Sequence, residues 1–197
     1  MKIVVFGPTG MIGSRIATEL ERRGHAVIAA SRATGTDVTD PASIATVASG
    51  ADAVVSAVSA RSGGYTLVDV ARSLVDGVRR AGVRRLLIAG GAGSLEVSLG
   101  VRLVDTPEFH EEWKPEALDQ AAALEVFRSV DDLDWTYVSP AALIHPGERT
   151  GRYRLDGDRL LIDEQGNSEI SAEDYAIGIA DLLEQGSHPR ERITVGW

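Results

Sequence analysis

The stretch GPTGMIG, residues Gly7–Gly13, decides how the rest of the chain is interpreted. It follows KIVVF (Lys2–Phe6), a short apolar run typical of a buried strand, and it opens a segment, Met11–Arg23, in which apolar residues recur at helical spacing. A glycine run between a strand and a helix is either a tight turn or a phosphate-binding loop. The spacing Gly-x-x-Gly-x-x-Gly in this strand–turn–helix context favours the phosphate-binding loop, with the simple turn as the alternative.

Each glycine of the run has its own physical role in such a loop. Gly7 lets the chain turn sharply off the strand, Gly10 lets a phosphate approach the backbone, and Gly13 lets the helix pack against the strand. The free N–H groups of the first helical turn and the helix dipole then attract the phosphates. We therefore expect the pyrophosphate of a dinucleotide to be bound by Gly7, Thr9, Gly10, Met11, Ile12 and Gly13.

The end of the second expected strand, His25–Ser31, indicates which dinucleotide is bound. An NAD site usually places Asp or Glu there for the ribose 2′-hydroxyl, whereas an NADP site uses Arg for the 2′-phosphate. This chain has Ser31-Arg32 and no acidic residue before Asp37. We therefore expect Ser31 and Arg32 to bind the 2′-phosphate and NADP(H) to be preferred over NAD(H). The alternative is a solvated loop arginine.

The remaining pattern alternates strands with helices. A short third strand is expected around Thr36–Val38, with Asp37 and Val38 beside the adenine. Later strands are expected at Ala51–Ser59, Arg84–Gly91, Trp135–Pro140 and Glu191–Trp197, and helices at residues 41–49, 65–81, 115–130 and 173–184, with Asp40 and Ser171 as N-caps. This alternation predicts an α/β fold of the Rossmann type, with a doubly wound and mainly parallel sheet.

One domain is expected over residues 1–197, because the chain contains no linker, internal repeat or low-complexity tract. Residues 145–172 are expected to form a small cap or hairpin insertion within that domain. The hairpin is expected at Asp156-Gly157, between RYRL and RLLI, because Asp-Gly between two apolar runs is a hairpin signal.

Composition excludes several classes of function. The formal net charge of −9 and the pI of about 4.9 argue against a nucleic-acid surface and a polybasic membrane footprint. The chain has no cysteine, so it has no disulfides and no cysteine nucleophile. Its histidines are scattered without ligand spacing, so no metal site is expected. No signal peptide and no apolar run of about 20 residues is found, and a cytoplasmic protein is expected.

Several segments together are more specific than any single motif. GPTGMIG, DVTDP, GADAVVSAV, RLLIAGGAGSLEV and WTYVSPAALIHPGERTG, in this order and spacing, resemble the atypical short-chain dehydrogenase/reductases. Within them the chain most resembles the NmrA-like group of NAD(P)H-flavin reductases, which includes the biliverdin-reductase-B-like enzymes. The resemblance implies strand order 3-2-1-4-5-6 with one further strand. It also implies a nicotinamide dinucleotide bound across the carboxyl ends of the strands.

The resemblance also assigns residues to the ribose and the nicotinamide. By position, Ala57, Val58 and Ser59 would lie by the ribose, and the segments 90–94 and 139–142, with Gly90, Pro140 and Ala141, would frame the nicotinamide. Ser94 resembles a serine that other members place near the nicotinamide, where it could hydrogen-bond the acceptor as a catalytic group. A turn or N-cap role for Ser94 is the alternative.

The chain departs from the carbonyl-reducing short-chain dehydrogenases in one respect. No tyrosine has a lysine four residues later, and the closest spacing is His110-x-x-x-Lys114. Trp113, His145 and Tyr153 are candidates to line or stack on an aromatic acceptor, with ordinary packing as their alternative. The missing acid–base pair is less of a problem when the acceptor is a planar ring that takes hydride directly.

The sequence therefore predicts an NADPH-dependent oxidoreductase that transfers hydride to a planar acceptor such as a flavin or quinone. A non-enzymatic NADP(H)-binding redox sensor is the main alternative. An epimerase or dehydratase ranks below both, because the tyrosine is absent and few residues follow the sixth expected strand. The oligomeric state stays open.

Overall fold

A seven-stranded sheet forms the centre of the chain, in a computed structural model that describes residues 1–59 and 64–197. Its order is β2-β1-β3-β4-β7-β11-β9, and every pairing is parallel except that of β9 with β11. The strands are β1 (Lys2–Phe6), β2 (Ala26–Ala30), β3 (Ala53–Ser56), β4 (Arg85–Ala89), β7 (Asp134–Pro140), β9 (Arg154–Asp156) and β11 (Glu191–Gly196). This confirms the expected α/β fold.

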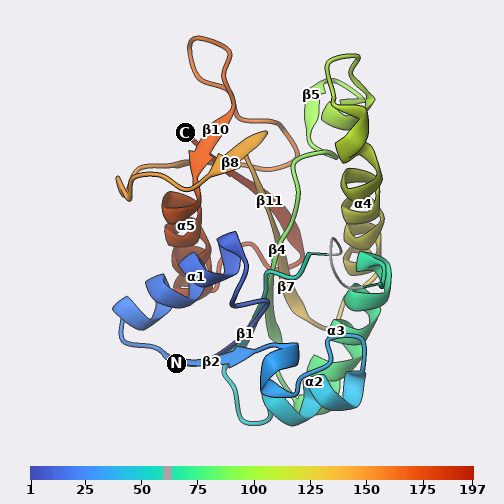
Figure 1. Cartoon of the computed structure of the whole chain (residues 1–197), viewed down its shortest axis with the longest axis vertical. Helices are drawn as coiled ribbons and strands as arrows, with labels where there is room; N and C mark the ends of the chain where they lie inside the picture. The colour runs from blue at the N-terminus through green and yellow to red at the C-terminus, as the bar shows by residue number, and fades with distance from the viewer. Residues whose placement is uncertain (60–63) are drawn as a thin grey trace.

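Helices cover both faces of the sheet (Figure 1). On one face lie α1 (Met11–Arg22) and α5 (Ala172–Gln185), and on the other lie α2 (Pro41–Ala48), α3 (Leu67–Ala81) and α4 (Lys114–Arg128). Two small sheets are added outside this sandwich, β5 (Glu96–Ser98) with β6 (Val101–Arg102), and β8 (Leu143–His145) with β10 (Glu169–Ser171). The connections are therefore those of a doubly wound sheet.

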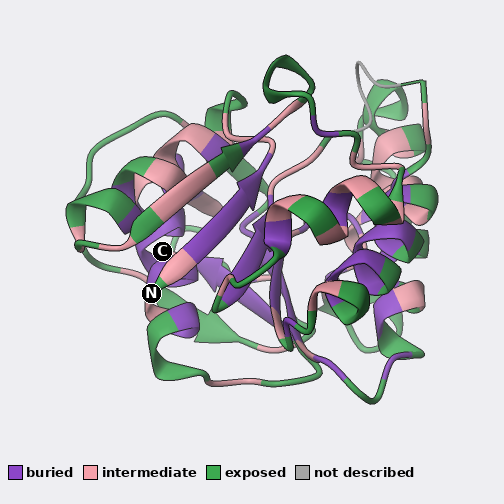
Figure 2. Cartoon of the chain, turned by 90° about the horizontal axis from the view of Figure 1, so that it is seen from below, coloured by how far each residue is buried: buried purple, intermediate pink, exposed green. Residues whose placement is uncertain are grey.

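The central strands of this mostly parallel sheet are buried, because the connecting helices cover both of its faces. All four residues of β3 are buried, as are the last four of β1. Figure 2 shows buried strands in purple at the centre of the molecule, with helices around them that are green on their outer sides. Strands buried on both sides read as continuous apolar runs, as KIVVF does. Two apolar clusters form, one on each face of the sheet.

Side-chain caps start three of the helices. Asp40 caps α2 by accepting hydrogen bonds from the next N–H groups and Ser171 caps α5, as the sequence predicts, and Thr66 caps α3. Gly24 and Gly82 end their helical segments with φ values of +82° and +73°, which favour glycine.

The strand expected at Thr36–Val38 is wrong. The chain instead forms a short 3-10 helix at Arg32–Thr34 and then a turn. The turn is held by Asp37, whose carboxylate accepts hydrogen bonds from the N–H and the hydroxyl of Thr39 at 2.8 and 2.7 Å. Local Asp and Thr hydrogen bonding of this kind competes with strand formation. The sheet therefore ends at β2.

The expected hairpin at Asp156-Gly157 does not form. β9 pairs with the edge of β11 instead, with Leu155 opposite Val195. After it, Asp158 accepts a hydrogen bond from Arg192 Nε at 2.6 Å, and Arg159 forms an isolated bridge with Glu96. The edge of β11 thus pairs the first arm of the expected hairpin, and Glu96 bonds the backbone of Asp158 and Leu160 at the start of the second.

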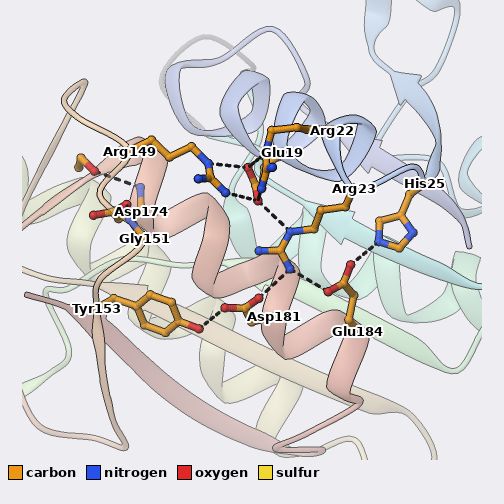
Figure 3. Close-up of polar contacts among 11 residues, drawn as sticks. Glu19, Arg22, Arg23, His25, Arg149, Gly151, Tyr153, Asp174, Asp181 and Glu184 are labelled. Carbon is orange, nitrogen blue, oxygen red and sulfur yellow. Dashed lines mark hydrogen bonds and ion pairs between the residues drawn. The ribbon is translucent and has the colours of Figure 1, made fainter.

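An ion cluster joins α1 to the segment that follows β8. Glu19 is only 4% exposed, and it accepts hydrogen bonds from Arg22, Arg23 and Arg149 at 2.8–3.0 Å. Burial alone would raise the pKa of Glu19, but the hydrogen bonds from the three arginines lower it well below its usual range. Arg149 is the member that fixes the later segment to α1 (Figure 3).

The same cluster extends from α1 to α5. Arg23 donates to Asp181 at 2.6 Å and to Glu184 at 2.8 Å, and His25 contacts Glu184 at 2.7 Å. The hydroxyl of Tyr153 donates to Asp181. Arg23 follows the last residue of α1, so these contacts hold the carboxyl-terminal end of α1 against α5 (Figure 3).

Replacing Glu19→Gln should lower the free energy of unfolding by about 3 kcal/mol at pH 7, because it removes the buried anion that three arginines share, of which Arg23 is itself largely buried. The folded-state pKa lies below the usual value of 4.5. The contribution of Glu19 is therefore present above about pH 4.5 and is lost as the pH falls toward the folded-state pKa.

Urea unfolding of wild type and variant at a series of pH values measures this difference. It should narrow steadily below pH 4.5. Glu21→Gln, on an exposed residue of the same helix, is the matched control and should change stability by less than about 0.5 kcal/mol. A stability difference between wild type and Glu19→Gln that does not change with pH would contradict its assignment to the ionised Glu19 carboxylate.

Candidate functional site

The turn after β1 packs against α1 and β3 with no spare room. Gly7 has a φ of +75°, and a Cβ there would lie 2.5 Å from the carbonyl oxygen of Ala57. A Cβ on Gly13 would lie 2.0 Å from the carbonyl oxygen of Gly7. Both glycines are therefore required by the chain itself, as the roles assigned to them predict. Their packing places the start of α1 at the carboxyl ends of β1 and β3.

Gly10 differs from its two neighbours in the motif. It has a φ of −73°, and the nearest atom to a Cβ built there is the carbonyl oxygen of Gly7 at 3.6 Å. The residue is exposed. Neither backbone strain nor packing within the protein therefore calls for glycine, whereas a ligand lying against the backbone would. This is the observation that fits a phosphate at this turn.

The first turn of α1 has N–H groups with nothing to bond. Ser14 N donates to Gly10 O at 3.0 Å, but among the described residues the N–H groups of Met11, Ile12 and Gly13 have no acceptor. No side chain caps the helix, in contrast with α2, α3 and α5, and its first turn contains no acidic residue, in contrast with α3 and α5. Aligned free N–H groups at a helix start form an anion site. Thr9, exposed beside them, offers a hydroxyl.

A cationic side chain follows β2 at the neighbouring strand end. Arg32 is exposed, and within the described ranges it meets no acidic or hydrogen-bonding partner. Ser31 precedes it, and its N–H donates to Thr34 Oγ1 at 2.9 Å. The carboxylate of Asp37 is held by Thr39, whose hydrogen bonds lower the pKa of Asp37. Val38 packs against the apolar cluster beneath α3.

The other expected cofactor residues follow β3, β4 and β7. Ala57 N donates to Phe6 O at 2.9 Å and Gly90 N donates to Val138 O at 2.8 Å. Ala141 N donates to Val195 O at 2.9 Å, directly after Pro140. Val58 is partly buried, and Ser59 Oγ lies 3.3 Å from Glu116 on α4. The structure thus brings these residues to the one sheet edge where the glycine loop and Arg32 lie.

The run Gly90-Gly91-Ala92-Gly93 is shaped by α4 and by a tyrosine. A Cβ on Gly90 would lie 1.9 Å from the ring of Tyr137, and one on Gly91 would lie 2.3 Å from Gln120 Oε1. The Tyr137 hydroxyl donates to Gln120 O at 3.1 Å, and burial raises the pKa of Tyr137, so its phenol stays protonated. Sequence reasoning missed both Tyr137 and Gln120. The glycine run itself was the available signal that something packs closely there.

Ser94 is held by a buried arginine. Its Oγ accepts a hydrogen bond from Arg192 Nη1 at 3.0 Å, and Arg192 also binds Asp158. Ser94 lines a cavity of about 550 Å³ beside α4, and the glycine loop contributes nothing to that cavity. The structure therefore gives this hydroxyl a partner within the chain, and its catalytic role stays a prediction.

The expected acceptor-lining residues are spread over the molecule. Trp113 is 47% exposed at the start of α4, with its ring 4.4 Å from that of His110. His145 contacts Pro146 O at 3.0 Å, and its ring lies 6.3 Å from that of Trp197. Tyr153 is bonded to Asp181 beside the far end of α1, about 18 Å of helix from Gly10. Of the three, Trp113 alone adjoins α4, the helix that covers Gly91, and it directly precedes that helix.

The pair His110 and Lys114 is not assembled for acid–base chemistry. Lys114 is bonded to Glu111, whereas His110 lies against Trp113. Among residues 1–59 and 64–197, no group of three His, Asp or Glu side chains could hold a metal ion. In the same ranges no helix is long and apolar enough to cross a bilayer.

Comparison with known proteins identifies similar chains. Residues 7–186 match the model of a family described as NAD(P)H-binding. A solved structure from Burkholderia pseudomallei, described as an exported protein, is 51% identical with a TM-score of 0.94 and full coverage of both chains.

Two further solved structures are each 37% identical. One, described as an epimerase, is from Bacteroides thetaiotaomicron, with a TM-score of 0.92 and coverage of 100% of this chain and 96% of that one. The other, described as an NADH-flavin reductase, is from Streptococcus pneumoniae, with a TM-score of 0.86 and coverage of 100% and 99%.

The glycine loop gives a paired prediction. Gly10→Ala should cost about 1 kcal/mol of stability or less, because only a helix-cap preference changes. It should weaken NADP⁺ binding about tenfold or more, because the methyl group displaces the phosphate from the N–H groups. Gly13→Ala should cost about 3 kcal/mol of stability through overpacking. Urea unfolding measures the loss of stability, and calorimetric titration measures the loss of NADP⁺ affinity. Equal stability losses for Gly10→Ala and Gly13→Ala would contradict the different roles given to the two glycines.

Proposed function

Because the chain belongs to the NAD(P)H-binding family, we propose that it is an NADPH-dependent oxidoreductase that transfers hydride to a planar acceptor such as a flavin or quinone. The observation that carries the proposal is the uncapped start of α1, where free N–H groups adjoin the open face of Gly10. The relative from Streptococcus pneumoniae described as an NADH-flavin reductase supports the type of reaction.

The preference for NADP(H) rests on Arg32. A dinucleotide with its pyrophosphate on α1 extends its adenosine half toward the end of β2, which lies beside β1. The exposed guanidinium of Arg32 meets no other partner in the described part of the chain, so it can bind a 2′-phosphate. Asp37, the first acidic residue after β2, has one carboxylate oxygen, Oδ1, bonded to Thr39.

The chain's own contribution to the reaction is binding and orientation. A bound nicotinamide supplies the hydride. The residues after β3 and β4 form the surface on which a flat ring would lie, and the tight packing of Gly90 and Gly91 keeps that surface fixed. No tyrosine has a lysine four residues later, and Tyr137 keeps its proton in a buried bond. An acceptor that takes its proton from water suits this arrangement.

Two alternatives remain in view. A non-enzymatic NADP(H) sensor would use the same cofactor residues without turnover. The relative described as an epimerase is 37% identical to this chain and has the same fold, so an epimerase is the second alternative. The missing tyrosine–lysine pair favours hydride transfer to a ring over both carbonyl reduction and epimerisation. The cytoplasmic location stays a prediction, since another relative is described as an exported protein.

Turnover tests the reaction directly. Purified protein mixed with NADPH and, in turn, riboflavin, FMN and a benzoquinone should oxidise NADPH with at least one acceptor, faster than the same mixture without protein. The absorbance of the reduced nicotinamide reports the rate. Tight NADPH binding without oxidation by any of these acceptors would favour the sensor instead.

Arg32→Ala tests the choice of cofactor. A charge-assisted contact is worth about 1.5–3 kcal/mol, so NADP⁺ affinity should fall more than tenfold while NAD⁺ affinity changes little. Arg80→Ala removes another exposed arginine, on α3, and is the matched control. Equal losses for NADP⁺ and NAD⁺ would remove Arg32 from the 2′-phosphate site.

A further inference from the structure

The amide oxygen of Gln120 has no partner among the described residues. This atom, Oε1, is buried and accepts no hydrogen bond there. Buried polar side-chain atoms are nearly always hydrogen-bonded, so an orphan amide needs a specific explanation. Either a water molecule or a ligand supplies the missing partner.

The side chain is held in place by its surroundings. Gln120 lies directly over Gly91, where a Cβ would come within 2.3 Å of Oε1 and 3.3 Å of Nε2. The backbone carbonyl of Gln120 accepts a hydrogen bond from Tyr137, and the neighbouring Asp119 accepts one from Leu67 N at 2.7 Å. These contacts fix this turn of α4 against both the sheet and α3, so the amide has a defined position.

That position is where the ring-bearing end of a dinucleotide would lie. The glycine loop adjoins β1 and Arg32 follows β2, so the other half of a cofactor bound there would extend across β3 toward β4. Gly91 follows β4 by two residues, and Gln120 covers it. The nicotinamide half carries a carboxamide and ribose hydroxyls, and each of these both donates and accepts hydrogen bonds. A neutral side-chain amide has the same pair of functions.

We propose that Gln120 is a cofactor-binding residue that hydrogen-bonds the nicotinamide half of NADP(H), at its carboxamide or its ribose hydroxyls. The proposal rests on the proposed dinucleotide function and names a contact within it. Gln120 would thereby set the height and tilt of the ring over Gly91. The glycine at 91 is needed because the amide occupies the space of any side chain there.

The competing explanation is a single trapped water. A cavity of about 20 Å³ lies beside Gln120, lined also by Ser56, Tyr137 and apolar residues of α3 and β4. This is room for one water molecule. Water alone would give Gln120 a structural role with no effect on cofactor affinity, so cofactor fragments separate the two explanations.

The test is calorimetric titration of wild type and Gln120→Met with three probes. They are NADP⁺, 2′-phospho-ADP-ribose, which lacks the nicotinamide ring, and 2′,5′-ADP, which lacks the whole nicotinamide half. Gln120→Met should weaken NADP⁺ binding about tenfold, the size of a lost hydrogen bond. It should leave 2′,5′-ADP affinity unchanged within about twofold. A loss for 2′-phospho-ADP-ribose assigns the contact to the ribose, and no loss assigns it to the carboxamide.

Two results would overturn the proposal. One is an unchanged affinity for NADP⁺, which is the outcome for a trapped water. The other is an equal loss for NADP⁺ and 2′,5′-ADP, which is the outcome for a general disturbance of α4. The melting temperature of the ligand-free variant should be equal to or above that of wild type, because an orphan polar group is removed. Gln120→Leu is the second variant, and should behave in the same way.

The exposed Glu125→Gln on the same helix is the matched control and should change none of these affinities. The outcome is separable from that of the turnover test. Wild type that binds NADP⁺ but oxidises NADPH with no acceptor would remove the proposed reaction and leave the Gln120 comparison intact.

Discussion

The close approach of α1 to the turn after β1 is the constraint on which the site depends. Gly13 lies against Gly7 O, and Gly7 lies against Ala57 O, so helix, turn and the end of β3 are packed backbone to backbone. No side chain can separate them without moving the helix. This packing points the start of α1 at the sheet edge where the parallel strands end, and it leaves the free N–H groups of that start uncovered.

The stability that α1 lacks at its start is supplied at its other end. An uncapped helix start forgoes about 1 kcal/mol that a Ser or Asp cap would give. At the far end Glu19 and Arg23 connect α1 to α5 and to Arg149. The carboxyl-terminal end of α1, where no ligand is expected, is thus fixed by ion pairs. Its amino-terminal end, where a phosphate is expected, is left uncapped. Breaking a local rule at a functional site, with compensation elsewhere, is a common pattern in proteins.

The elements that local chemistry specifies could be predicted from the sequence. KIVVF, the Asp40 cap and the Ser171 cap each act through residues a few positions away, and each was predicted. One failure was local, because the turn that Asp37 and Thr39 form replaced the expected strand at Thr36–Val38. The other failures came where distant partners decide. A β11 edge took β9 away from its expected hairpin, and Glu19 meets Arg149 across 130 residues, which no periodicity reveals.

The same distinction holds for the candidate site. The glycine loop is local, and its geometry has the form that its spacing predicts. The residues near the expected nicotinamide position come from distant parts of the chain. Gln120 contacts Gly91 only because α4 folds back over the end of β4. A crystal structure with NADP⁺ is the most direct test of the account. The pyrophosphate should lie within hydrogen-bond distance of the Met11 and Ile12 N–H groups, with the nicotinamide beside Gly91. A dinucleotide bound elsewhere, with the start of α1 facing only solvent, would contradict it.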